Sequence, residues 1–372
     1  MPGLNQLLAA PRRDCGGIAT LVAIFLTGGV LLGSGALVVD VGRLYAERQE
    51  LQNGADAAAT AIAEECARIP STCATSAPTL ADRYANQNAK DGASTVSVIC
   101  GSAAGTGLAP CPAPTAGLTG CVGQLPAGTK YVEVRTRTRL SDGSTLLPST
   151  LSTSLLGHAD YEGTNVGACA RAAWGPPSRA RGMAVTISVC EWNQMTSGGT
   201  VFAVDPAQGS PPASAEKIIY LHTTSGALTC PAGPSGWNAP GGFGWLDENN
   251  GPCATDIDAD GGYGGGTGAS ASDACKTALA AAAATPHVLP VPIYDGVHGT
   301  GTDTIYHLAG VASFVLTGYA VPGVRRSSSL TGRHWCSGDE KCLYGYFTRS
   351  LLPSTADLGG QERGGSVVVL AG

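Results

Sequence analysis

The longest uninterrupted hydrophobic run of the chain covers residues 18–39 and contains no charged residue. An α-helix rises about 1.5 Å per residue, so a helix over this run would be about 33 Å long and could cross the apolar core of a bilayer. Arg12 and Arg13 precede the run, and a basic flank favours the cytoplasmic side. We therefore predict a single-pass membrane protein with residues 1–17 in the cytoplasm and the bulk of the chain extracytoplasmic or at the cell surface. A cleaved secretory signal is the alternative, but its apolar part is usually shorter and no A-x-A cleavage site follows here.

A helical pattern continues beyond the apolar run. Hydrophobic and small residues recur at alternating steps of three and four, interrupted by Arg48, and they are Val41, Leu44, Leu51, Ala55, Ala58, Ile62, Cys66 and Ile69. This spacing predicts one face of an α-helix, which Pro70 ends. Alanine is small and forms helices well, so a partner surface could pack closely on this stripe. Two interpretations stay open: the helix packs on its own globular domain, or it packs on copies of itself or on pilin helices.

The residues around this transition carry a resemblance to a known family. GGIATLVAIFL followed by VVDVGRLYAERQELQNGADAAATAIA resembles the N-terminal signature of the TadE/TadG-like proteins of the Flp (tight-adherence) pilus assembly system. The matching positions after the apolar run are Val39, Asp40, Gly42, Arg43, Tyr45, Arg48, Leu51, Gln52, Ala55, Asp56, Ala57, Ala58 and Ala59. The resemblance implies a membrane-anchored minor pilin-like protein or assembly factor whose partners are pilus or pseudopilin subunits, Tad secretion components and the membrane. On this basis we expect positions for helix packing and assembly at Asp40, Gly42, Arg43, Tyr45, Leu51, Ala55, Ala58 and Ile62.

Short strands follow the long helix. TVSVIC (95–100), KYVEVRTRTRL (130–140) and VGACARAAW are the candidate segments. The second segment alternates between two faces, one with Val132, Val134, Thr136 and Thr138 and one with Glu133, Arg135, Arg137 and Arg139. This period of two predicts a strand whose charged face lies in water. Together with the long helix, these strands predict a small pilin-like α/β unit within residues 40–177.

Residues 178–372 consist of apolar runs separated by glycine-rich loops. The whole chain has 53 glycines and 23 prolines, a composition that favours turns and short strands over a helical bundle. SDACKTALAAAAAT (272–285) is the one strong helix candidate here, and Pro286 stops it. We therefore predict an α+β fold: an N-terminal membrane-spanning helix that continues into the α/β unit, followed by a disulfide-rich, mainly β exterior domain over residues 178–372.

The cysteines support an exterior location. Of the 13 cysteines, Cys15 precedes the apolar run and the other twelve follow it. An even number beyond the membrane and the absence of C-x-x-C spacing favour disulfides over free thiols or zinc sites. Connectivity cannot be deduced from the spacing, but three local pairs are candidates: Cys66 with Cys73, Cys253 with Cys275, and Cys336 with Cys342.

Candidate chemistry is sparse. The net charge of −6 and the few basic residues exclude a nucleic-acid partner, which would require a basic face. DIDADGGYGGGT begins like a calcium-binding loop with Asp256, Asp258 and Asp260, but Thr267 stands where the bidentate glutamate belongs. An acidic, glycine-rich turn is the preferred interpretation of this segment, with weak calcium binding as the alternative.

No sequence motif for a catalytic nucleophile, a metalloprotease or a phosphate-binding loop is present. We expect no cofactor and no enzymatic activity. The favoured function is a membrane-anchored component of a Tad/Flp-type pilus, with adhesion as one expected use of the exterior domain. The alternative is a membrane-anchored surface binding module or hydrolase that is unrelated to pili.

Overall fold

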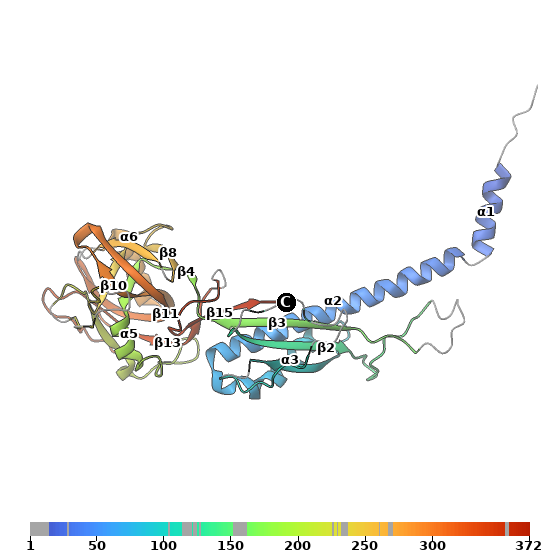
Figure 1. Cartoon of the computed structure of the whole chain (residues 1–372), viewed down its shortest axis with the longest axis horizontal. Coiled ribbons are helices and arrows are strands. Elements are labelled where there is room, and N and C mark those ends of the chain that lie inside the picture. The colour runs from blue at the N-terminus through green and yellow to red at the C-terminus, as the bar shows by residue number, and fades with distance from the viewer. Residues whose placement is uncertain are drawn as a thin grey trace, which may run out of the picture.

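A computed structural model describes residues 15–27, 30–102, 105–113, 121, 125, 128–151, 162–224, 227–228, 230–231, 237–259, 261–266, 271–353 and 357–372. Its long axis runs from helix α1 at one end to a β-rich domain at the other (Figure 1). Between them lies a unit in which a long helix packs on a sheet.

Two helices share the apolar run, where one was predicted. Helix α1 (Cys15–Thr27) and helix α2 (Val30–Arg68) point in different directions in Figure 1, and residues 28–29 lie outside the described residues. The Thr27 hydroxyl donates to the Ala23 carbonyl at 2.6 Å, a contact that disfavours straight continuation of a helix. Within the described part of the chain, no helix combines the length and apolar character needed to cross a membrane. The described residues of the predicted helix over 18–39 are helical in two segments, α1 and the start of α2, and the predicted cytoplasmic segment lies almost entirely outside the described residues.

Helix α2 then continues to Arg68, close to the end predicted from Pro70. The chain turns through the short 3-10 helix η1 (Pro70–Thr72) and returns as helix α3 (Cys73–Asn88) beside α2. The Cys66–Cys73 disulfide fastens this turn. Gly54 lets the two helices approach closely, because a Cβ atom there would lie 3.2 Å from backbone atoms of Ala85.

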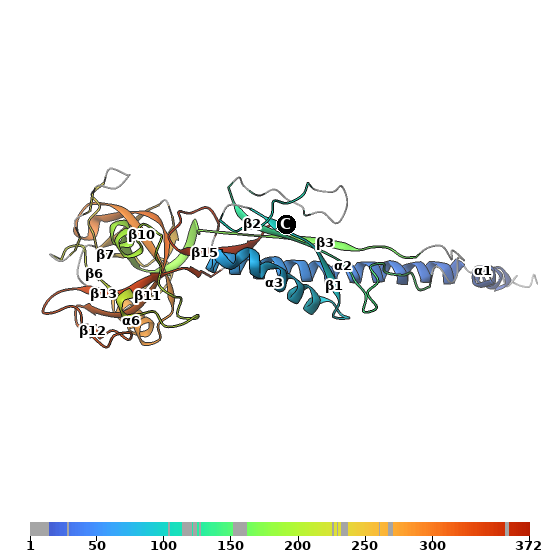
Figure 2. The same cartoon turned by 90° about the horizontal axis from the view of Figure 1, so that it is seen from below.

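One face of α2 covers a five-stranded sheet, as Figure 2 shows from below. In spatial order its strands are β1 (Ser94–Gly101), β2 (Lys130–Thr138), β3 (Gly167–Gly175), β15 (Gly365–Leu370) and β14 (Ser350–Leu351). β1, β2, β3 and β15 pair antiparallel, whereas β14 pairs with β15 in parallel. The first three strands lie at the segments that the sequence pattern predicted.

The fourth strand corrects the predicted domain boundary. Residues 178–372 were assigned to the exterior domain, but β15 pairs with β3, with Val367 opposite Gly175 and Leu370 opposite Ala172. The last strand therefore belongs to the sheet of the first unit, and the exterior domain is inserted between two neighbouring strands of that sheet. Hydrophobicity alone could not reveal this, because strand pairing over such a sequence distance is not a local property.

The exterior domain is mainly β, with two further helices, α5 (Val189–Thr196) and α6 (Asp273–Ala284). Its main sheet contains, in order, β10 (Val288–His298), β5 (Val185–Ser188), β7 (Phe243–Leu246), β9 (Gly262–Gly266), β11 (Thr304–Val321), β13 (Cys342–Thr348) and β6 (Lys217–Tyr220), and β12 (Val324–Arg326) pairs with β11. Because β10 also pairs with β11, the strands from β10 to β11 close into a ring. A small ribbon of β4 (Arg179–Met183) and β8 (Ala254–Asp258) lies apart, and the 3-10 helices are η2 (Ala213–Ala215) and η3 (Gly301–Asp303).

Six disulfides join twelve cysteines, a density typical of proteins in oxidising compartments. Three are the local pairs expected from the sequence: Cys66–Cys73, Cys253–Cys275 and Cys336–Cys342. The others are Cys100–Cys111, Cys121–Cys169 and Cys190–Cys230. All six therefore lie beyond the apolar run.

Candidate assembly site on the long helix

The Asp40 and Arg43 side chains fasten α2 to a loop between β2 and β3. The Asp40 carboxylate accepts hydrogen bonds from the backbone N–H and the hydroxyl of Thr150, at 3.0 and 2.9 Å, and also from the Leu151 N–H. Arg43 donates to the Thr150 hydroxyl at 3.0 Å and reaches the Pro148 carbonyl. Charged hydrogen bonds of this kind are stronger than neutral ones. We call this contact the latch.

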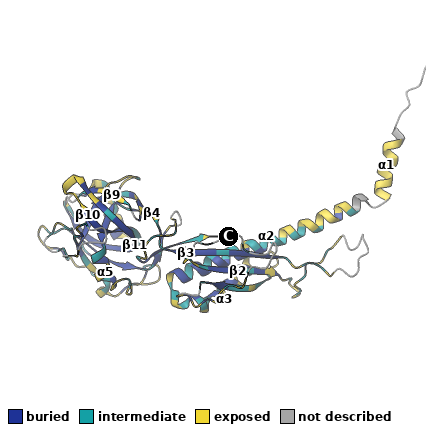
Figure 3. Cartoon of the chain, viewed as in Figure 1, coloured by how far each residue is buried: buried dark blue, intermediate teal, exposed yellow. Residues whose placement is uncertain are grey.

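The helical segments that precede the latch in the sequence form an exposed apolar surface. On α1 and the first turns of α2, large hydrophobic side chains are mostly or half exposed (Figure 3), and they are Ile18, Leu21, Val22, Ile24, Phe25, Leu26, Leu37, Val38, Val39 and Val41. Leaving this much apolar surface in water is unfavourable, and a contiguous apolar patch marks an interaction site. On α2 the exposed aliphatic positions stop at Val41, within the latch, and the exposed aromatic Tyr45 follows them.

Gly42 and Tyr45 face outward at the same level of the helix. A Cβ atom at Gly42 would have no neighbour within 4 Å, and Tyr45 is 71% exposed. Neither residue therefore packs within the folded chain. A few residues on, burial raises the pKa of the Glu47 carboxyl, an effect that the neighbouring Thr138 hydroxyl partly offsets.

Part of the alanine stripe packs inside the chain's own fold, the first of the two interpretations that the sequence left open. Ala55, Ala58 and Ile62 are fully buried in a core formed with α3 and the sheet. Leu51 is also buried, and its carbonyl accepts a hydrogen bond from the Thr136 hydroxyl. In the folded chain these four positions are internal and pack within the chain's own fold. A role of these positions in assembly stays an untested prediction.

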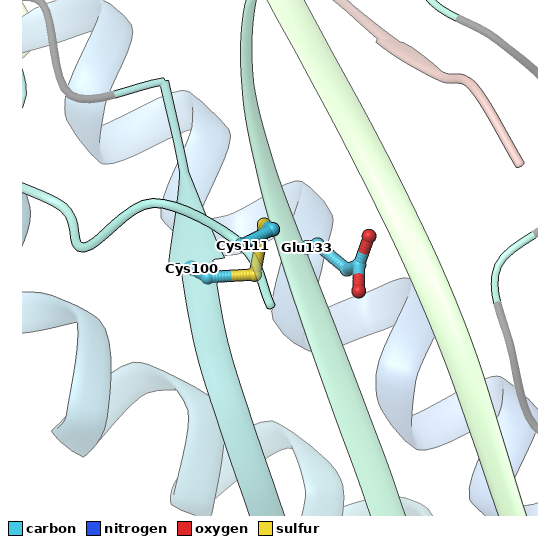
Figure 4. A group of neighbouring side chains, drawn as sticks. All are labelled: Cys100, Cys111 and Glu133. Atoms are coloured by element: carbon cyan, nitrogen blue, oxygen red, sulfur yellow. A yellow bond between two sulfur atoms is a disulfide. The ribbon is translucent and has the colours of Figure 1, made fainter. Parts of the chain in front are cut away.

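The opposite face of the sheet contains a buried ion cluster. Glu133 is fully buried, and its two carboxylate oxygens accept hydrogen bonds from Arg135 Nε at 2.6 Å and Arg171 Nε at 2.7 Å. The prediction that this charged face lies in water is therefore wrong at Glu133. Disulfides hold covering segments there, and Figure 4 shows Cys100 and Cys111 next to the carboxylate.

The same cluster could be taken for a metal site. Sulfur atoms of Cys100, Cys111, Cys121 and Cys169 lie near the Glu133 carboxylate. All four are in disulfides, and a metal-binding cysteine has to be a thiolate. With Glu133 already paired to two arginines, this arrangement is structural and not a metal centre.

The weak calcium candidate lies mostly on a strand. Asp256 and Asp258 belong to β8, where they stand opposite Arg181 and Arg179 of β4. Asp258 lies 3.7 Å from Arg179, and Asp256 accepts a hydrogen bond from Asn250. The expected turn is therefore a strand up to Asp258, while Asp260 lies outside the described residues. Calcium binding stays an untested prediction.

Polar groups buried in the exterior domain hydrogen-bond to one another. The Glu216 carboxylate accepts hydrogen bonds from four side chains, those of Thr317, Ser328, Thr331 and Trp335. His222 contacts the Tyr306 hydroxyl at 2.9 Å, and burial lowers the pKa of this imidazole. His307 lies 2.6 Å from Asp295. Each of these contacts joins segments of the domain, which is a structural use of the side chains.

A comparison with known families identifies the helical region. Residues 16–63 match the family described as putative Flp pilus-assembly TadE/G-like. The N-terminal region of this chain is a Tad domain. The match includes the exposed apolar surface, the two helix residues of the latch (Asp40 and Arg43) and most of the buried stripe, and it confirms the resemblance seen in the sequence. No curated protein and no solved structure gives a significant match to the chain.

Two parts of this site were missed from the sequence alone. Nothing in the segment around Thr150 marks it as the partner of Asp40, since the two residues are 110 positions apart. Glu133 offered a signal, because a single acidic residue precedes a row of arginines at alternate positions. The alternation located the strand correctly but could not reveal that loops cover its charged face.

Proposed function

We propose that this chain is a membrane-anchored, non-catalytic component of a Tad/Flp-type pilus, either a minor pilin-like subunit or an assembly factor. One observation carries the proposal: within the Tad domain, the exposed apolar surface on α1 and early α2 ends at the latch, where the helix joins a folded unit. Such a surface is stabilised in lipid or against apolar helices of other subunits.

The proposed topology follows from charge and cysteine chemistry. Arg12 and Arg13 keep the N-terminus in the cytoplasm, and the apolar positions of residues 18–39 lie in the bilayer. Asp40 and Arg43 lie at the outer membrane edge, where both side chains form hydrogen bonds with Thr150. The six disulfides form beyond the membrane, in an oxidising compartment.

The exterior domain is the part that we propose to lie farthest from the membrane and to contact other cells or surfaces. In Figure 1 it lies at the opposite end of the molecule from α1. A position far from the membrane suits a domain that contacts other cells or surfaces, so adhesion is its proposed use. Pilus or pseudopilin subunits and Tad secretion components are the proposed partners of the helical end.

Site-specific photo-crosslinking tests the proposal in cells that make the pilus. A photoreactive amino acid at Tyr45, which is exposed, is expected to crosslink the full chain to a pilus or Tad component. The same probe at Ala58, which is fully buried, is the matched control and is expected to give no intermolecular product. Crosslinking at Tyr45 only to lipid, or only to proteins outside the pilus system, would refute the pilus role and favour an anchored surface protein unrelated to pili.

Membrane insertion has its own test. Double replacement of Leu21 and Phe25 by lysine places two charges on the exposed apolar surface, which is costly in a bilayer. We expect this variant to become extractable from membranes by alkaline carbonate, whereas Ile305→Lys, at an exposed apolar residue of the exterior domain, should stay membrane-bound. Equal retention of both variants would contradict the anchor.

A further inference from the structure

The chain crosses twice between the first unit and the exterior domain. It leaves the first sheet at Gly175, the end of β3, contributes the short edge strand β14 on its return, and pairs beside β3 from Gly365, the start of β15. β3 and β15 are antiparallel neighbours, so both crossings lie at the same end of the sheet. A domain held by two adjacent connections cannot rotate freely, unlike a domain at the end of a single linker.

Backbone hydrogen bonds join the two crossings to each other. The Ser178 N–H donates to the Asp357 carbonyl at 2.7 Å, and the Gly359 and Gly360 N–H groups donate to the Pro176 carbonyl at 3.1 Å. Glycine is required at position 360, because a Cβ atom there would lie 1.9 Å from the Pro177 carbonyl oxygen. Among the described residues, the two crossings are therefore paired to each other, with an antiparallel bridge between Pro177 and Leu358.

The parallel strands β14 and β15 contribute to both hydrophobic cores. Val367 belongs to the core of the exterior domain, whereas the next residue, Val368, packs against the core beneath α2. The same division occurs in the β14 segment, where Leu352 belongs to the exterior core and Leu351 packs against the α2 core. Successive side chains of a strand point to opposite faces, so this strand pair is a wall with one core on each side. We call it the shared wall.

We propose that the shared wall couples the two units thermodynamically, so that the two units unfold together. A change in the stability of the exterior domain therefore also changes the free energy of opening of α2. Neither core can be complete without the wall, and the wall cannot leave one core without leaving the other. A ligand that stabilises the exterior domain would therefore also protect α2, because coupling between two sites is reciprocal. This holds whichever partner the helical end has.

Hydrogen exchange of the full-length protein in detergent micelles tests the coupling. Leu279 of α6 is fully buried in the exterior core and lies outside the wall. Leu279→Ala should increase the opening equilibrium on the order of 10²-fold, the effect expected for a large-to-small core substitution. We expect the slowest amides of α2, between residues 51 and 67, to exchange faster by the same factor as those of α6. Unchanged exchange in α2 would overturn the proposal.

Two adjacent valines supply a matched pair. Val367→Ala removes side-chain atoms from the exterior core, and Val368→Ala removes the same atoms from the α2 core. Coupled units predict that each substitution accelerates exchange in both α2 and α6. If each affected only its own side, the two cores would be independent. Should Leu279→Ala fail to fold, Leu279→Val gives the same comparison with a smaller factor.

Discussion

Ala58 offers a direct check on whether the alanine stripe is internal. Its side chain has no exposed surface in the core between α2, α3 and the sheet. Leucine would add three carbon atoms to a site that is already closed on all sides. Overpacking of this kind costs about 1–3 kcal/mol of folding free energy, which corresponds to a decrease in Tm of roughly 1–4 °C for a chain of this size. We expect Ala58→Leu to lower the Tm within that range.

Ala46→Leu is the matched control, because Ala46 lies on the same helix and is exposed. Alanine and leucine are both good helix formers, so helix propensity nearly cancels in the comparison. Thermal unfolding of the purified full-length chain, followed by circular dichroism, measures both variants. An exposed position should change stability by less than about 0.5 kcal/mol. If Ala58→Leu left the Tm unchanged but reduced association with other subunits, the stripe would face a partner and the internal packing would be wrong.

Two buried carboxylates give further predictions. Burial raises the pKa of Glu191 from 4.5 to about 7, with the backbone N–H groups of Gly242 and Leu228 partly opposing the shift. Since the folded state binds this proton more tightly than the unfolded state, the stability contributed by protonated Glu191 is lost as the pH rises from about 4.5 through 7. Glu191→Gln should therefore increase the urea midpoint of unfolding at pH 8 relative to wild type and have little effect at pH 4. Equal effects on the midpoint at both pH values would contradict the pKa shift. Glu133→Ala should destabilise the fold by about 3–5 kcal/mol, because it leaves Arg135 and Arg171 next to a buried site without their carboxylate partner. Urea unfolding measures this loss of stability. A loss below about 1 kcal/mol would show that water forms the hydrogen bonds of both arginines.

The local elements were largely predictable from the sequence. Steps of three and four located α2, alternation located β2, short strand-like segments located β1 and β3, and Pro286 marked the end of α6. These features depend on neighbouring residues, which share a face at a period of 3.6 or 2. Asp40, Arg43 and Tyr45 could be chosen as expected assembly positions because they lie in the region that matches the Tad family, and their role in assembly stays a prediction.

The partners of those positions were not predictable. Amphipathic spacing shows that Ala55, Ala58 and Ile62 share a face, but it is silent on what covers that face. Hydrogen bonds from Thr150 to Asp40 depend on how a long connection folds back along the helix. The buried Glu133 carboxylate lies beside two disulfides, and the sequence alone did not predict how those cysteines pair. Long-range pairing therefore accounts for most of the corrections.

The last strand shows what the sequence does contain about long-range packing. SVVVL, residues 366–370, has consecutive apolar residues where a half-exposed strand would alternate. A strand that is apolar on both faces is usually covered on both faces, and here Val367 meets the exterior core and Val368 meets the core under α2, whereas Leu370 is 57% exposed. The buried face of the Tad domain therefore depends on residues about 300 positions after its end. It follows that residues 16–63 form a sequence signature by which the family is identified, and not a unit that folds independently. We therefore expect α2 to adopt its native packing only in a chain that retains β15.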